Sequence, residues 1–295
     1  MDLLTQLNLA MEYIEENISN DLTLLDISSV TTYSDYHFGR LFYYIAEMPL
    51  SEYIRKRKLS LAAMELQRSR EKVIDLAIKY GYDSADSFTR AFVKQHNVTP
   101  TVVRKQGVEL KIFPPLSFQI KIKGVQAMNW RIEQKETFEV FGVERIFNND
   151  ETAKVPEFWT ECHQNGSYEK LFDAVGGVRN PDGSGEPLKD GSCVIRAVCG
   201  YRNSGEGGFP YMICALKDSD SKTDGFKVAQ IPEATWAVFK SEKSNRIGEN
   251  IPVLFNRAYS EWLPTSGYDK ADGPDIEIYG IGFEEVWIPV IKKGK

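Results

Sequence analysis

The segment SADSFTRAF (residues 84–92) decides the fold of the first half of the chain, because SDYHFGRLF (34–42) repeats its pattern 50 residues earlier. Both segments have the form S-x-x-x-F-x-R-x-F, and each begins with a Ser suited to cap a helix N-terminus. The two Phe residues of each segment are four apart, so they share one helix face and pack inward. The sequence therefore predicts two related helices, which present Arg40 and Arg90 outward.

Each of these helices follows a short apolar helix and a tight turn, in TLLDISSVTTY (23–33) and VIDLAIKYGYD (73–83). This arrangement predicts two helix-turn-helix units. The segment between them, LSEYIRKRKLSLAAMELQRS (50–69), is expected to form a helix of roughly 28 Å at about 1.5 Å per residue. That length is close to the ~34 Å between successive major grooves on one side of a duplex. One chain could then address two adjacent grooves of double-stranded DNA.

The charge of the chain neither supports nor excludes nucleic-acid binding. The 295 residues carry a net charge of −6, which argues against a DNA-binding protein. Residues 1–110, however, hold thirteen basic and fifteen acidic side chains, and four basic ones are contiguous at RKRK (55–58). These four either contact phosphates or only solvate the central helix, and both interpretations stay open.

The pattern of the chain changes near residues 108–113. Helical periodicity extends to about residue 108, and Pro114 and Pro115 then interrupt any helix. Beyond them the sequence alternates as strands do. We predict an all-α domain with two helix-turn-helix motifs over residues 1–110 and an α+β domain over residues 111–295. The expected helices are 3–14, 22–31, 34–45, 50–68, 73–80, 84–96, 100–106, 155–166, 167–175 and 249–263, and the expected strands are 118–124, 138–147, 192–201, 235–241, 275–283 and 284–291.

Several classes of protein are disfavoured by the sequence. The first residues lack the basic start and apolar core of a signal peptide, and no apolar run approaches 18 residues. We therefore expect a cytoplasmic protein that makes no membrane contact, in which Cys162, Cys193, Cys199 and Cys214 are reduced thiols. Motifs for phosphate binding, a serine nucleophile or a metal are missing from the sequence. The predicted protein is not an enzyme and uses no cofactor and no metal.

The first half resembles the bipartite DNA-binding domain of the AraC/XylS family over residues 1–108. The motif of the second unit in that family is represented here by Gly81, Tyr82, Ser87, Phe88, Arg90, Phe92, Thr99, Pro100 and Arg104. Asn97 replaces the usual Gly before the last helix, and Asn tolerates a left-handed backbone. Val103 stands where an aromatic residue is common. The resemblance implies that base edges or nearby phosphates contact Tyr36, Gly39, Arg40, Ala85, Asp86, Ser87, Thr89 and Arg90.

Asp86 is the unexpected member of this set, since a surface that faces phosphates favours Lys or Arg. A carboxylate near the N-terminus of a groove-facing helix can accept a hydrogen bond from cytosine N4. It can equally serve to cap the first turn of the helix. The arginines at positions 40 and 90 are the natural bidentate partners of guanine.

The second half combines aromatic residues with acidic ones. In DIEIY (275–279), alternation places Asp275, Glu277 and Tyr279 on one face of a strand. In the last strand Glu285 and Trp287 also share a face. A carboxylate beside aromatic rings could bind an organic cation, because each cation–π contact contributes ~0.5–2 kcal/mol. The alternative is that these aromatic residues form an ordinary core and that both Glu residues are solvated.

Residues 111–295 are similar to the GyrI-like effector-binding domain. The similarity is carried by IKGVQAMNWRI, VPEFWTEC, IPEATWAVF, SEWLPTSGY, GPDIEIY and EVWIPV, in this order. It implies two pseudo-symmetric βαββ units around a pocket lined with aromatic residues and a Glu. The ligand-binding residues implied by the motifs are Trp159, Tyr201, Trp236, Glu277, Tyr279 and Glu285.

Together these features predict a sequence-specific transcription regulator, an activator by the habit of the family, controlled by a small hydrophobic or cationic molecule. The expected partners are double-stranded DNA, an aromatic or cationic effector and RNA polymerase, for a monomer or a homodimer. Two alternatives remain. The second domain could hydrolyse a small electrophile with Glu285 or Glu277 as base, or the regulator could act without a ligand.

Overall fold

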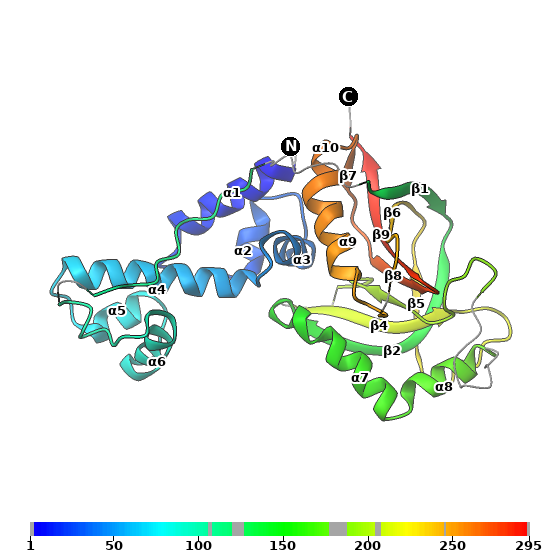
Figure 1. The fold of residues 1–295 in the computed structure, drawn as a ribbon, viewed down its shortest axis with the longest axis horizontal. Coiled ribbons are helices and arrows are strands. Elements are labelled where there is room, and N and C mark those ends of the chain that lie inside the picture. Colours follow the sequence, from blue (N-terminus) through cyan, green and yellow to red (C-terminus); the bar gives the residue numbers. More distant parts are fainter. Residues whose placement is uncertain are drawn as a thin grey trace. The chain divides into compact units, whose positions relative to one another are not determined.

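The computed structural model describes residues 3–105, 108–119, 127–176, 188–203, 208–244 and 246–293. They form two compact units. The first unit comprises residues 3–35 and 46–119, and the second comprises residues 36–45 and 127–293. The second unit therefore includes a helix from the N-terminal half of the chain in addition to the C-terminal sheet. Each unit is drawn in Figure 1, coloured along the sequence.

The first unit is helical, as predicted. Its helices, shown from blue to cyan in Figure 1, are α1 (Leu3–Glu16), α2 (Leu24–Ser29), α4 (Leu50–Arg68), α5 (Val73–Lys79) and α6 (Ala85–His96). Phe88 and Phe92 of α6 are fully buried against apolar residues of α4 and α5. Gly81 has φ +81° and makes the tight turn between α5 and α6, where few other residues are tolerated. The second helix-turn-helix unit is thus built on the face that the repeat predicted.

The ends of α6 are set by the residues expected to set them. Ser84 is the N-cap, and its hydroxyl accepts a hydrogen bond of 3.1 Å from the backbone N–H of Ser87. Asn97 ends the helix in the left-handed conformation, with φ +60°. The helix predicted over 100–106 is not formed, because residues 100–104 make a series of turns instead.

The basic segment of α4 is largely used inside the first unit. Arg57 is buried and donates from Nε to Glu15 of α1 at 2.8 Å. Lys56 forms an ion pair one helical turn back, and Lys58 donates to a backbone carbonyl. Arg55 is exposed. Arg57 therefore joins α1 to α4 rather than offering its charge to solvent.

The second unit contains a β-sheet with helices. Its helical elements are α3 (Asp35–Ala46), η1 (Asn149–Lys154), α7 (Val155–Gln164), α8 (Ser167–Ala174), α9 (Ile251–Arg257), η2 (Ala258–Trp262) and α10 (Leu263–Thr265). Its strands are β1 (Asn129–Lys135), β2 (Phe138–Asn148), β3 (Arg196–Cys199), β4 (Gly208–Leu216), β5 (Lys227–Ile231), β6 (Ala234–Lys240), β7 (Tyr268–Lys270), β8 (Asp275–Gly280) and β9 (Phe283–Lys292). Most of the strand predicted over 118–124 lies outside the described residues.

The strand order contains the repeat implied by the GyrI-like resemblance. All strand pairs are antiparallel, in the order β1-β6-β9-β8-β3-β4-β2-β5, and β7 pairs with β9. The run β2–helices–β3–β4 and the run β6–α9–β8–β9 each have the connectivity βαββ. In the sheet they meet through the pair β8–β3, with strands arranged in mirrored order on either side. The two βαββ units are therefore related by pseudo-symmetry.

The two faces of β8 have different environments. Ile276 and Ile278 point into an apolar cluster that includes Trp236 and Trp287. Because side chains alternate along a strand, the opposite face holds Asp275, Glu277 and Tyr279 of β8. All of these side chains are buried. A sheet face with buried carboxylates needs compensating partners, and they define the candidate site.

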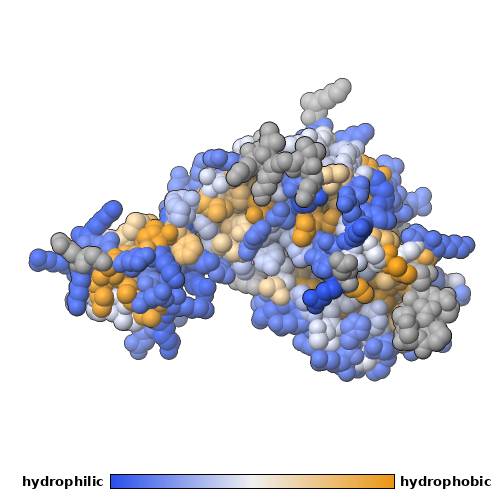
Figure 2. All heavy atoms as spheres, viewed as in Figure 1, coloured by the Kyte–Doolittle hydropathy of each residue, from blue (hydrophilic) through white to orange (hydrophobic). Residues whose placement is uncertain are grey.

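Hydrophilic side chains cover most of the surface seen in Figure 2, with apolar groups exposed in smaller patches among them. No helix in the described parts of the chain is long and apolar enough to cross a membrane. All four cysteines are free, and Cys199 and Cys214 are fully buried.

Candidate functional sites

The acidic face of β8 is aligned with two neighbouring strands. Asp275 of β8 is paired in register with Cys199 of β3, and Cys199 is paired with Tyr211 of β4. Glu277 lies two residues further along the same face of β8. The antiparallel register thus assembles these side chains from segments that are distant in sequence.

Glu277 is held by two tyrosines. Its Oε2 accepts hydrogen bonds from the hydroxyls of Tyr211 at 2.7 Å and Tyr279 at 2.8 Å. The indole N–H of Trp159, on α7, donates to the Tyr211 oxygen at 2.9 Å. Burial raises the pKa of both tyrosines well above the usual value, so the phenols stay protonated and donate. The two tyrosines therefore fix the orientation of the Glu277 carboxylate through Oε2, and its Oε1 stays available to another partner.

Asp275 has its own partners at the other end of the face. Its Oδ1 lies 3.3 Å from Lys270 Nζ, and its Oδ2 accepts from the Tyr259 hydroxyl at 3.4 Å. Asp275 is fully buried and Lys270 nearly so. Burial lowers the pKa of Lys270, and the Asp275 carboxylate opposes that shift. We call Asp275, Glu277, Tyr211, Tyr259 and Tyr279 the carboxylate site.

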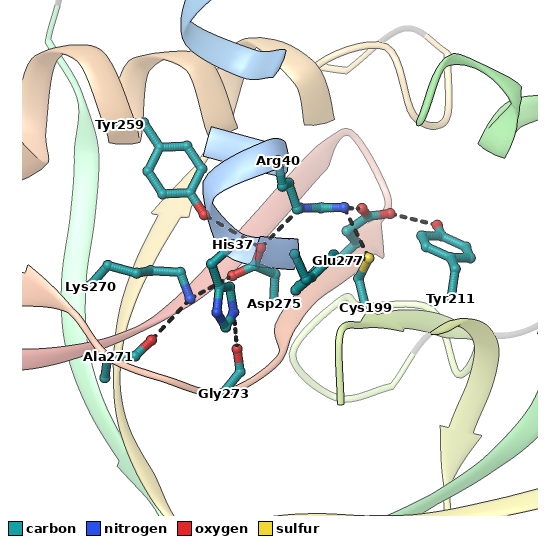
Figure 3. Close-up of polar contacts among 11 residues, drawn as sticks. His37, Arg40, Cys199, Tyr211, Tyr259, Lys270, Ala271, Gly273, Asp275 and Glu277 are labelled. Atoms are coloured by element: carbon teal, nitrogen blue, oxygen red, sulfur yellow. Dashed lines mark hydrogen bonds and ion pairs between the residues drawn. The ribbon is translucent and has the colours of Figure 1, made fainter. Parts of the chain in front are cut away.

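Arg40 of α3 occupies the carboxylate site, as Figure 3 shows. Its Nε is 3.0 Å from Asp275 Oδ2, and its Nη2 is 3.4 Å from Glu277 Oε1. Its Nη1 donates to Cys199 Sγ at 2.9 Å. Arg40 is only 3% exposed. Burial disfavours its charge, but the neighbouring Cys199, Tyr36, Tyr44 and Asp275 hold the pKa of Arg40 well above its ordinary value.

Other residues of α3 also contact the rest of the second unit, through hydrogen bonds and a ring stack. Tyr36 donates from its hydroxyl to Cys199 Sγ at 2.9 Å. His37 Nε2 lies 2.8 Å from the carbonyl oxygen of Gly273. Near the C-terminal end of α3, the Tyr44 ring stacks on Phe255 of α9, with 4.7 Å between the ring centroids. The whole length of α3 is therefore engaged, and not Arg40 alone.

The predicted ligand-binding residues fall into two groups. Trp159, Glu277 and Tyr279 lie together, and the rings of Trp159 and Tyr279 are 5.2 Å apart. Trp236 and Glu285 lie on the opposite face of the sheet, where Glu285 accepts two hydrogen bonds of 3.0 Å from Arg131.

Tyr201, the sixth predicted ligand-binding residue, packs against the apolar cluster of the opposite face, and its hydroxyl donates to Glu144. Asp275, Tyr211 and Arg40 were not predicted from the sequence as members of the effector site. For Asp275 a signal existed, since it shares a face of β8 with Glu277.

The predicted DNA-contacting residues also divide into two groups. On α6, Asp86 and Arg90 are exposed, and Ala85, Ser87 and Thr89 are half-buried. This face of α6 is accessible. On α3, by contrast, Tyr36, Gly39 and Arg40 are buried. Contact between these three and DNA requires α3 to leave the carboxylate site, and the DNA-contacting role of all eight stays a prediction.

A helix-turn-helix region joined to a pseudo-symmetric βαββ sheet defines a class of proteins that combine a DNA-binding domain with a small-molecule-binding domain. Family models bear this out: a helix-turn-helix domain matches residues 27–106, and a GyrI-like small molecule binding domain matches residues 128–291. The chain belongs to the AraC-type DNA-binding transcription regulators that carry a C-terminal GyrI-like domain.

Three of the similar proteins are transcription regulators that each match about a third of this chain. The HTH-type transcriptional activator AarP of Providencia stuartii is 42% identical over 92 residues, which are 31% of this chain and 68% of AarP. The regulatory protein SoxS of Salmonella typhimurium is 34% identical over 94 residues, 32% of this chain and 88% of SoxS. The transcriptional regulator Rob of the same species is 33% identical over 106 residues, 35% of this chain and 37% of Rob.

Proposed function

We propose that this regulator activates transcription in response to a hydrophobic organic cation, which binds at the carboxylate site. The observation that carries the proposal is the pair of buried carboxylates, Asp275 and Glu277, set among aromatic side chains on one face of the GyrI-like sheet. Such a face compensates positive charge and offers ring faces for cation–π contact. The activator role is supported by the similarity to AarP, which is described as an activator.

Tryptophan fluorescence tests the position of the effector. Trp159 donates to Tyr211 of the carboxylate site, whereas Trp287 lies on the opposite face. Titration with benzyltrimethylammonium and with benzamidine should quench the wild type and the Trp287→Phe variant, but not Trp159→Phe. Neutral benzamide is the matched control. Quenching that survives in Trp159→Phe and disappears in Trp287→Phe would move the effector to the other face.

The same titration separates a sensor from an enzyme. After prolonged incubation with the protein, a panel of bound compounds should be recovered intact and in stoichiometric amount by mass spectrometry. Products formed over many turnovers, and lost in Glu277→Gln, would assign a hydrolytic activity to the domain instead.

On the DNA side, we propose that α3 and α6 enter adjacent major grooves. The exposed outward face of α6 and the length of α4 support this proposal. Selection of genomic fragments bound by the full chain identifies the operator. Transcription from that operator with purified RNA polymerase should then increase when the regulator and an effector are both present. A decrease would make the protein a repressor.

A further inference from the structure

We infer that Arg40 is an intramolecular occupant of the effector site, and that the effector is a planar cation with several N–H donors, such as an amidinium or a guanidinium. This effector takes the place of Arg40, so α3 leaves the sheet and becomes available to DNA. The inference rests on the proposed function, because it assigns the same carboxylate site. It adds the chemical class of the ligand and the way in which the ligand acts.

The geometry around Arg40 is that of a site for a planar cation. The three guanidinium nitrogens face three different groups: Nε faces Asp275, Nη1 faces Cys199 and Nη2 faces Glu277. The guanidinium carbon lies over the Phe255 ring, 4.5 Å from the ring centroid. Donors spread in a plane fit this arrangement, whereas a compact ammonium group cannot reach the acceptors together.

The charges explain why a cation is needed. Among the described residues, Arg40 forms ion pairs with Asp275 and Glu277, and Lys270 forms one with Asp275. If Arg40 leaves, Glu277 keeps its tyrosine donors but loses its cation. A buried carboxylate without a cation is strongly disfavoured. Departure of α3 therefore requires that another cation take the place of Arg40 beside Glu277.

A separate feature shows that the sheet is shaped to receive α3. Gly200 follows β3 with φ +69°, and a Cβ built there would lie 2.0 Å from the Tyr36 ring. The Tyr36 ring occupies the space that any side chain at position 200 would take. In addition, the side chain of Asn256 on α9 donates to the Tyr44 backbone carbonyl. These contacts involve neither charge nor Arg40, so the seat of α3 extends beyond the ion pairs.

Seating of α3 and DNA contact by the same residues exclude each other. The guanidinium of Arg40 cannot be enclosed by Asp275, Glu277 and Cys199 while it contacts a guanine. Arg40 also competes with the effector for the same site. The apparent affinity for the effector therefore equals the intrinsic affinity multiplied by the fraction of molecules in which α3 is not seated. Removal of the competitor should therefore tighten effector binding.

Calorimetric titration with benzamidine tests this competition. Benzamidine should bind Arg40→Ala at least about tenfold more tightly than it binds the wild type, because the internal competitor is gone. Arg131→Ala, which removes an arginine from Glu285 on the opposite face, should bind it as the wild type does. Benzamide should bind none of the three proteins. Equal or weaker binding of benzamidine to Arg40→Ala overturns the competition.

Hydrogen exchange provides a readout that does not depend on a substitution. In the wild-type protein, benzamidine should accelerate amide exchange in peptides that cover residues 35–46. Exchange in β8 should be unchanged or slower. Benzamidine binding without faster exchange in α3 overturns the displacement step, and it does so even if Arg40→Ala fails to fold.

Comparison with benzyltrimethylammonium separates the inference from the proposed function. This cation has no N–H donor, so it should bind at the carboxylate site at least about tenfold more weakly than benzamidine. If both cations bind equally and both lose affinity in Glu277→Gln, the proposed function stands and the assigned ligand class is wrong. If neither binds wild type or Arg40→Ala, both proposals fail.

Discussion

Arg40 and Arg90 occupy the same position in the repeated pattern, but one is buried in an ion pair and the other is exposed. Arg90 should therefore contribute to DNA binding without any rearrangement. We expect Arg90→Ala to lose about 1–3 kcal/mol of specific binding to the selected operator. Arg68→Ala, which removes an exposed arginine from the end of α4, is the control. Gel shifts that give both variants the wild-type affinity would contradict the role of Arg90.

The structure bears on the role of Asp86. Ser84 caps α6, while the Asp86 side chain is exposed in the first turn. We therefore expect Asp86→Ala to relax the sequence preference at one base pair and to leave stability nearly unchanged. Ser84→Ala should do the reverse and cost about 1 kcal/mol of unfolding free energy. Binding selections on randomised operators, together with urea unfolding, measure both effects. Equal sequence preference with lower stability in Asp86→Ala would restore the capping role.

At the scale of elements, α3 is held on the sheet by an anion that can be neutralised without a change of shape. Glu277→Gln keeps an acceptor for Tyr211 and Tyr279 but removes the negative charge facing Arg40. This variant should bind the operator about tenfold more tightly than wild type when no effector is present, because seated α3 is less favoured. Glu285→Gln on the opposite face should bind as wild type does. Unchanged affinity in Glu277→Gln would contradict the hold of the sheet on α3.

The elements themselves were largely predictable from local patterns. The repeat of Phe residues predicted α3 and α6, and the alternation of Ile with acidic and aromatic residues in DIEIY predicted β8. The strand β4 was missed, because GFPYMICAL is a continuous apolar run that contains Pro and does not alternate. The helix predicted over residues 100–106 was wrong, because residues 100–104 form turns. So short a segment has few residues with which to form a helix.

The site was less predictable than the fold, because its essential contact joins residues 237 apart in the chain. Helix periodicity correctly gave Arg40 a face different from that of the core Phe residues. It could not show that a sheet built from the other end of the chain would cover that face. Asp275 and Glu277 belong to one strand and were detectable. The partner that neutralises them was not.

For the whole molecule, effector and operator should bind with positive coupling. If benzamidine releases α3, then operator DNA, which uses the released α3, must tighten benzamidine binding by the same factor by which benzamidine tightens operator binding. Couplings of this kind are typically 5–150-fold. Titration of each ligand at saturating concentrations of the other measures the two factors. Unequal factors would point to a further state, and a factor of one would mean that the two binding events are independent.

Cys199 lies under α3, between the Tyr36 hydroxyl and Arg40, and burial raises the pKa of its thiol to about 12. If α3 leaves the sheet, as proposed, a thiol reagent can reach this sulfur while the rest of the unit stays folded. Cys162 and Cys214 are buried elsewhere in the same unit, so their labelling reports unfolding of the unit. The ratio of these labelling rates therefore reports how often α3 leaves the sheet relative to unfolding of the whole unit. It can be measured in living cells without an engineered probe.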